Sequence, residues 1–99
     1  MYDVAICMNA WCFDRKRSFL KEHASELLAG YQTVRPFTVE EKNALPVLAA
    51  GAAIRFLLTR LNDWFQDHGG ALVNRKDPED YIARLLVHRK VESAAEYGI

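Results

Sequence analysis

The stretch ALPVLAAGAAIRFLLTRLNDWF, residues 44–65, decides the fold of this 99-residue chain. Its apolar side chains repeat with the period of an α-helix. One set falls within an arc of about 140° on a helix that turns 100° per residue; it comprises Val47, Ala50, Ala53, Ile54, Leu57, Leu58, Leu61, Trp64 and Phe65. Leu48, Ala52 and Phe56 form a second apolar strip on the back of the helix. Because a helix with two apolar faces needs two neighbours, we expect it to be buried on more than one side.

Helical patterns also account for most of the remaining sequence. Residues 3–13 should form a helix that is apolar all round and therefore buried on every side. A second helix should begin at its cap Ser18 and end at Gly30, followed by an irregular connector at residues 31–37. A last helix should begin at the cap Asp77 and run to about residue 89.

Residues 38–46 predict a short additional helix. Thr38 and Glu41 have the spacing of a capping box, and Pro46 should kink the chain before the long helix, which two glycines at 69–70 end. The only strand candidate is residues 69–73, and the tail at 91–99 should fray because its apolar pattern fades. The predicted fold class is all-α, a single small helical bundle over residues 1–99 with four main helices plus a short one.

Composition excludes several classes of partner. Lys and Arg together number 13, as do Asp and Glu. The chain therefore carries no net positive charge that would favour binding to nucleic acid. We find no apolar run of the about 18 residues that a membrane helix needs, and no basic region of a signal peptide. Cys7 and Cys12 would point about 140° apart on a helix and cannot bridge each other, which suits a reducing compartment. We therefore expect a cytoplasmic protein without a nucleic-acid or membrane partner.

The sequence contains no recognisable motif for catalysis or metal binding. A Gly-rich phosphate loop, a nucleophile elbow and a zinc-binding helix motif are all absent. We expect no metal site, since no ligand spacing relates Cys7, Cys12, His23, His68 and His88. His23 is interpreted as a hydrogen-bonded histidine at the edge of the core, and His88 as a surface partner of Glu92.

Asn9 is the most informative polar residue, because an unpaired amide on a buried helix costs about 1–3 kcal/mol. It either makes an interhelical hydrogen bond or faces a ligand cleft beside Trp11. Arg55 is either a surface arginine with a buried stem or an ion pair or anion contact at an interface. Arg60 can reach Asp63 or Trp64 one turn on, and a surface pair is expected there.

Three segments together resemble a known family. YDVAICMNAWCF, LLAGYQTVRPFTVEEKNALPVLAAGAAIRFLLTRLNDW and KDPEDYIARLLVHR are similar to the C-terminal part of bacterial homoserine kinases of the aminoglycoside-phosphotransferase-like type, which have a protein-kinase-like fold. The resemblance covers residues 2–89. It implies the C-terminal helical subdomain of a longer kinase that uses ATP and magnesium to phosphorylate L-homoserine in threonine synthesis. For the 99 residues alone it implies no cofactor and no activity, because the family's nucleotide and catalytic motifs precede Tyr2.

The resemblance also implies roles for four residues. Asp3 resembles the aspartate that braces the catalytic loop, while Asn9, Trp11 and Arg55 would lie near the acceptor pocket; no residue of the chain would be catalytic or bind metal. The implied partner is the missing N-terminal kinase core, covering the second strip of residues 44–65 and a flank of the first helix. A homo-oligomer through exposed apolar surface is a further expectation. Two alternatives stay open: a non-catalytic helical interaction module that self-associates, and a fragment of a related small-molecule kinase with another acceptor.

Overall fold

Helices form nearly all of the regular structure in this computed structural model, which describes residues 1–65 and 77–99. They are α1 (Tyr2–Trp11), α2 (Lys21–Val34), α3 (Val39–Phe65), α4 (Glu79–Lys90) and the 3₁₀ helix η1 (Ala94–Tyr97). The predicted all-α fold class is confirmed for the described residues. The strand candidate and the glycine stop of the long helix lie outside those residues.

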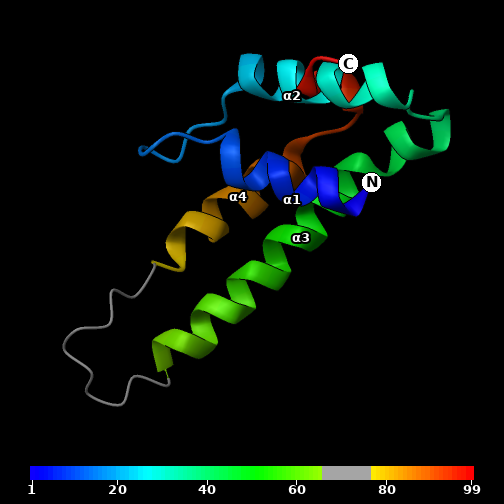
Figure 1. The fold of residues 1–99 in the computed structure, drawn as a ribbon. Helices are drawn as coiled ribbons and strands as arrows, with labels where there is room; N and C mark the ends of the chain where they lie inside the picture. The colour runs from blue at the N-terminus through cyan, green and yellow to red at the C-terminus, as the bar shows by residue number, and fades with distance from the viewer. Residues whose placement is uncertain (66–76) are drawn as a thin grey trace.

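The long helix α3 organises the molecule (Figure 1). Helix α1 crosses its N-terminal half, and α2 and η1 lie beyond α1. Helix α4 runs beside the C-terminal half of α3, which extends away from α1 and α2. The result is an elongated molecule of 47 × 25 × 21 Å.

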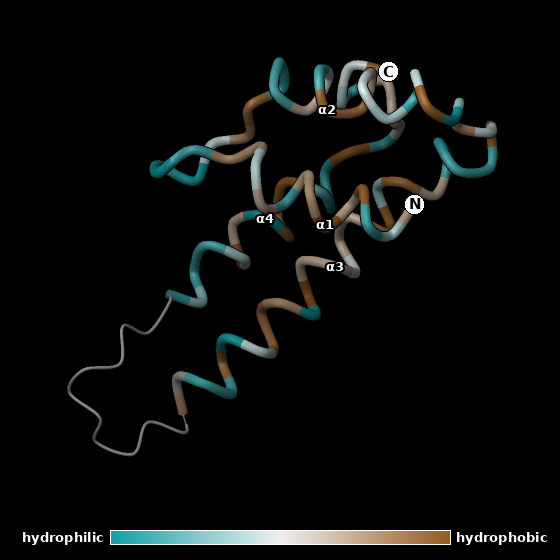
Figure 2. Tube along the Cα trace, viewed as in Figure 1, coloured by the Kyte–Doolittle hydropathy of each residue, from teal (hydrophilic) through white to brown (hydrophobic). Residues whose placement is uncertain are grey.

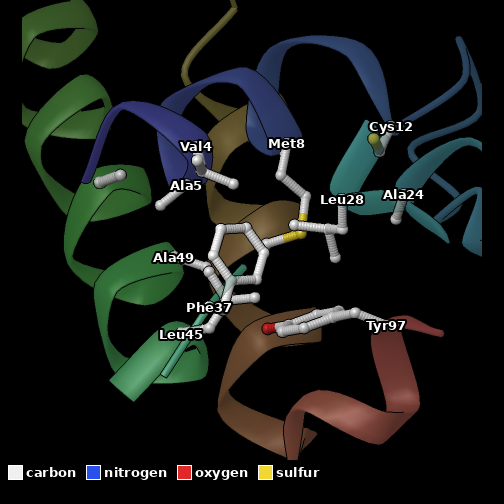
Figure 3. Packing of buried hydrophobic residues seen from close by; sticks show 11 residues of the cluster. Val4, Ala5, Met8, Cys12, Ala24, Leu28, Phe37, Leu45, Ala49 and Tyr97 are labelled. Atoms are coloured by element: carbon white, nitrogen blue, oxygen red, sulfur yellow. The ribbon is translucent and has the colours of Figure 1, made fainter. Parts of the chain in front are cut away.

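The hydrophobic core lies where α1, α2, α3 and η1 meet (Figure 3). Met8, Leu28, Leu45 and Tyr97 are its largest apolar side chains without exposed surface. Where α1 crosses α3 the packed side chains are small: Ala5, Ala49 and Ala52. Small side chains allow two helix backbones to approach closely, which brings polar groups of α1 within hydrogen-bonding distance of α3.

Helix α1 is buried on one side only, contrary to the expectation for residues 3–13. Val4 and Met8 have at most 4% of their surface exposed, whereas Trp11 has 74%. Helix α1 therefore has apolar surface that the described part of the chain leaves exposed.

The start of α2 also differs from the prediction. Ser18 does not cap the helix, because it belongs to a turn in which the Asp14 carboxylate accepts the backbone N–H groups of Lys16 and Ser18 at 2.8 and 2.9 Å. Arg17 adopts the left-handed conformation in this turn, with φ of 66°. The helix begins three residues later, after Leu20.

The end of α2 is set by Pro36 rather than by Gly30. Gly30 lies inside the helix, and residues 31–34 of the predicted connector are helical. The residue before Pro36 is extended, with φ of −149° and ψ of 112°, because the proline ring excludes helical geometry there. His23, expected at the edge of the core, is exposed.

The start of α3 confirms the predicted capping box. The Thr38 hydroxyl accepts the Glu41 N–H at 3.1 Å, and the Glu41 carboxylate accepts the Thr38 N–H at 3.0 Å. The predicted break at Pro46 is wrong, since Pro46 lies inside one helix of 27 residues. A proline removes only one backbone hydrogen bond from a helix. Burial of Leu45 before it and Ala49 after it keeps the helix continuous despite this loss.

The tail expected to fray is ordered in this structure. Ser93 and Glu96 form a capping box around η1, and the Tyr97 side chain has no exposed surface. At the other end of α4, Pro78 takes the N-cap position predicted for Asp77, while the Asp77 carboxylate still accepts the Glu79 N–H at 2.9 Å.

The two apolar faces of α3 are covered differently from the expectation. On the back strip, Ala52 is fully buried and the Phe56 ring stacks on Tyr81 at 5.5 Å. The predicted main stripe is instead partly bare, with Val47 and Leu58 exposed by 74% and 61%. Figure 2 shows that apolar residues continue along α3 into its C-terminal half.

Residues 39–63 of α3 are long and apolar enough to cross a membrane, by length and composition alone. This corrects the expectation that no run in the sequence reaches that length. The core helix of a soluble protein passes the same test. Here one side of the helix contacts α1 and α4, and Arg55 and Arg60 lie within the apolar stretch.

Candidate functional site

Of the four residues predicted to have functional roles, only Asn9 is buried. Its side chain has no exposed surface, whereas Asp3, Trp11 and Arg55 are exposed. The Arg55 guanidinium lies 5.9 Å from the ring of its neighbour Phe56. No hydrogen bond or ion pair joins any two of the four residues, so the described part of the chain does not assemble them into one site.

Asn9 belongs to a buried hydrogen-bonded network that connects three helices and the tail. Its Nδ2 donates to the carbonyl oxygen of Ala49 at 3.0 Å, which leaves Oδ1 as an acceptor for Nε2–H of His88 at 2.6 Å. The other ring nitrogen of His88, Nδ1, then accepts from the Tyr97 hydroxyl at 2.8 Å. The interhelical interpretation of Asn9 is confirmed, and its alternative role in a ligand cleft finds no support.

His88 is neutral in this network. The ring is 2% exposed, and burial together with the nearby Arg84 cation lowers its pKa from 6.5 to about 4. Burial also raises the pKa of the Tyr97 hydroxyl well above its ordinary value, so this group remains a donor. The predicted surface pair of His88 with Glu92 is wrong, because the ring points into the core.

Arg84 extends the network toward the N-terminus of α4. Its Nε donates to the Asn9 carbonyl oxygen at 2.6 Å, and a terminal nitrogen donates to the Asp80 carbonyl oxygen at 2.8 Å. The guanidinium lies 4.7 Å from the Phe13 ring and 4.8 Å from the Tyr81 ring. Burial lowers the Arg84 pKa from its ordinary value, while the two aromatic rings and two carbonyls stabilise the cation.

Asp80 gathers two further arginines at the same end of α4. Arg17 Nε lies 2.9 Å from one carboxylate oxygen, and Arg60 lies 3.4 Å from the other. The hydrogen bond from Arg17 lowers the Asp80 pKa. Arg60 also donates to the carbonyl oxygen of Asp77, just before α4, at 3.0 Å, so it contacts Asp77 and Asp80 rather than the predicted Asp63. The side chain of its other predicted partner, Trp64, lies outside the described residues. These pairs join the turn at 14–18, α3 and α4.

These groups hold helices together and offer little chemistry of their own. Both ring nitrogens of His88 are occupied, so the ring has no free position for a substrate proton. Burial and the neighbouring Cys7 raise the Cys12 pKa to about 11, which keeps that thiol protonated and a poor nucleophile. Among the residues that the structure describes, no three His, Cys, Asp or Glu side chains could hold a metal ion.

An open apolar groove of about 390 Å³ separates the middle of α3 from the end of α4. Its lining is mostly aliphatic, and His88 and Arg89 are its polar side chains; the others are Pro46, Val47, Ala50, Gly51, Ile54 and Val91. The groove can receive apolar side chains. It lacks the several converging polar groups that orient a small hydrophilic substrate.

Sequence reasoning identified Asn9 but missed its partners. Asn9 could be identified because a buried amide needs hydrogen-bond partners. Its partner His88 lies 79 residues away along the chain, and the sequence around His88 did not indicate that this ring is buried. Arg84 was missed because it lies 75 residues from Asn9, and Tyr97 because it lies in the tail that was expected to fray.

Comparisons with known proteins relate the chain to one kind of enzyme. No protein-family model matches the chain. The homoserine kinase of Gluconacetobacter diazotrophicus is 57% identical over 98 residues, which make up 99% of this chain and 30% of that protein. The homoserine kinases of Mesorhizobium japonicum and Brucella canis are 54% and 53% identical over the same share of this chain. Over nearly its whole length the chain is therefore similar to homoserine kinases, and it spans about 30% of the length of these relatives.

Proposed function

We propose that this chain is the C-terminal helical part of a homoserine kinase, an enzyme that transfers a phosphoryl group from ATP, with magnesium, to the hydroxyl of L-homoserine in threonine biosynthesis. The observation that carries the proposal is 57% identity over 99% of the chain to a protein of that name. The cytoplasm is the proposed location, because this reaction uses intracellular ATP.

The 99 residues alone are proposed to be inactive. Phosphoryl transfer depends on a loop that covers the phosphates, metal-binding carboxylates and a group that positions the nucleophile. The sequence contains no Gly-rich phosphate loop. The buried His88 and Cys12 are already hydrogen-bonded or held protonated, so they do not substitute for these groups.

The four predicted residues keep distinct proposed roles. Trp11 and Arg55 are exposed and available to line an acceptor pocket together with residues of the missing kinase core. Asn9 supports that pocket by fixing α1 against α3 through its bond to Ala49. Asp3, exposed in the first turn of α1, is proposed to brace the catalytic loop of the core.

A chimera tests this function. The 99-residue chain replaces the matching segment of the Gluconacetobacter diazotrophicus homoserine kinase, and phosphorylation of L-homoserine is measured with ATP and magnesium. We expect the chimera to be active and the isolated chain to show no turnover. The matched variants Arg55→Ala and Arg15→Ala, both at exposed arginines, should differ: only the first should lower kcat/KM, by about tenfold or more.

Two results would contradict the proposal. A folded chimera without homoserine kinase activity would favour the self-associating module, for which the exposed apolar side chains of α3 are the supporting observation. A chimera that prefers a different hydroxyl acceptor would favour the related small-molecule kinase.

A further inference from the structure

A continuous apolar surface on α3 and α4 is left without a neighbour in the described structure. We define the outer face as Val47, Gly51, Ile54 and Leu58 of α3 with Ile82 and Leu86 of α4. The α3 members follow each other at intervals of three and four residues, so they form one stripe. The exposed fractions of the five side chains range from 40% at Ile82 to 74% at Val47.

The groove places the α3 and α4 parts of the outer face on the same side of the molecule. Gly51 and Ile54 line it from α3, and Arg89 lines it from α4. Leu86 and Ile82 precede Arg89 by three and seven residues, the spacing of a single helix face. The outer face is therefore one surface that crosses the α3–α4 pair and includes the groove.

The C-terminal half of α3 has only α4 beside it in the described structure (Figure 1). Its back strip is already used, since Phe56 stacks on Tyr81 and Arg60 lies 4.3 Å from the same ring. The opposite side remains bare and reaches Phe65, which is 79% exposed. A further element must therefore approach α3 from the outer face rather than from the back strip.

We propose that the outer face is the surface on which the catalytic core of the homoserine kinase docks. This inference rests on the proposed function, and it replaces the back strip of Leu48, Ala52 and Phe56 as the docking surface. The matched relatives contain more than twice as much further polypeptide as this segment, and that polypeptide must meet it somewhere. An exposed apolar surface of this extent marks an interaction site. The rim carries Arg55 and Arg89, both exposed, so the docking surface of the core should place acidic side chains opposite them.

The test compares one substitution in two contexts. Leu58→Glu is made in the isolated chain and in the chimera described above. The matched control is Val34→Glu, at an apolar residue of α2 that is 88% exposed and lies outside the outer face. In the isolated chain both variants should keep the parent melting temperature within a few degrees, because neither side chain is buried there. In the chimera only Leu58→Glu should lower the melting temperature, by about 5 °C or more.

Each unexpected result of this experiment leads to a different conclusion. If the parent chimera is active but Leu58→Glu and Val34→Glu lower its melting temperature equally, the docking surface is wrong while the proposed function stands. If the active parent chimera sediments as a dimer that Leu58→Glu dissociates, a second copy occupies the outer face and the proposal is overturned. Binding of the parent chimera to phosphatidylcholine vesicles, abolished by Leu58→Glu, would assign the face to lipid and overturn it as well.

Discussion

Single side chains in this protein act mainly as connectors between helices. Asn9, His88 and Tyr97 form a chain of donors and acceptors in which each atom has one role, fixed by the carbonyl oxygen of Ala49 at one end. A second ring proton would reverse the bond between Nδ1 and the Tyr97 hydroxyl and leave the hydroxyl hydrogen without its acceptor, so the arrangement favours a neutral imidazole. Burial and Arg84 favour the same neutral state.

The buried imidazole predicts a stability that depends on pH. In the unfolded chain His88 binds a proton near its ordinary pKa of 6.5, but in the folded chain only near 4. Protons therefore favour the unfolded state between these values. Stability is fully present above about pH 6.5 and falls toward pH 4, by at most roughly 1.4 kcal/mol per pH unit.

Urea unfolding of the isolated chain at pH 7.5 and pH 5.0 measures this effect, with His88→Gln as the comparison. The variant is less stable at pH 7.5 but should lose less stability on acidification. An equal loss in parent and variant would show that other groups cause the acid sensitivity.

At the scale of the elements, local chemistry predicted some helix boundaries but not others. The last helix was expected to end at about residue 89, and α4 ends at Lys90. The Thr38–Glu41 capping box depends on residues three apart, so the sequence contains everything needed to recognise it. Gly30 and Pro46 were misread because their effects depend on surroundings. Gly30 has open space around it, and buried neighbours hold the helix together at Pro46. Burial of the tail depends on contacts with α2 and α3 that no local pattern reveals.

Two glycines should respond in opposite ways to the same substitution. A Cβ at Gly30 would meet nothing within 4 Å, so Gly30→Ala should raise the free energy of unfolding by about 0.5–1 kcal/mol. Gly98 has φ of 98°, and a Cβ there would lie 2.7 Å from the Ser25 Cβ. Gly98→Ala should therefore lower the free energy of unfolding by about 1 kcal/mol or more.

Thermal and urea unfolding of both glycine variants check this pair. A neutral Gly98→Ala would mean that the tail does not rest against α2 as described. A destabilising Gly30→Ala would mean that α2 ends earlier than Val34.

On the scale of the whole molecule, polar contacts join parts that the core does not reach. The Arg17–Asp80 pair connects the turn at 14–18 to α4, and Arg60 connects α3 to the same carboxylate. The sequence could not reveal this arrangement, because its members lie 20 and 63 residues from Asp80. The apolar stripe of α3 did predict, from the sequence alone, that part of the apolar surface of this chain would stay exposed.

Asp80→Asn should weaken this connection. Its side chain is 40% exposed, so after allowance for solvent screening we expect a loss of about 1 kcal/mol, smaller at high salt. Glu79→Gln is the matched control, because Glu79 is 68% exposed and has one ion pair, at 3.4 Å. Urea unfolding at low and high sodium chloride concentration measures both. If both variants lower the free energy of unfolding equally, Asp80 contributes no more to stability than Glu79.

The bond between Asn9 and His88 also has a kinetic consequence. It joins residues 79 apart, and the Arg84 bond to the Asn9 carbonyl joins residues 75 apart. Helical bundles usually fold fast because their contacts are local, and closing so long a loop delays the transition state. We therefore expect the docking of α4 against α1 to be the slow step in the folding of this chain.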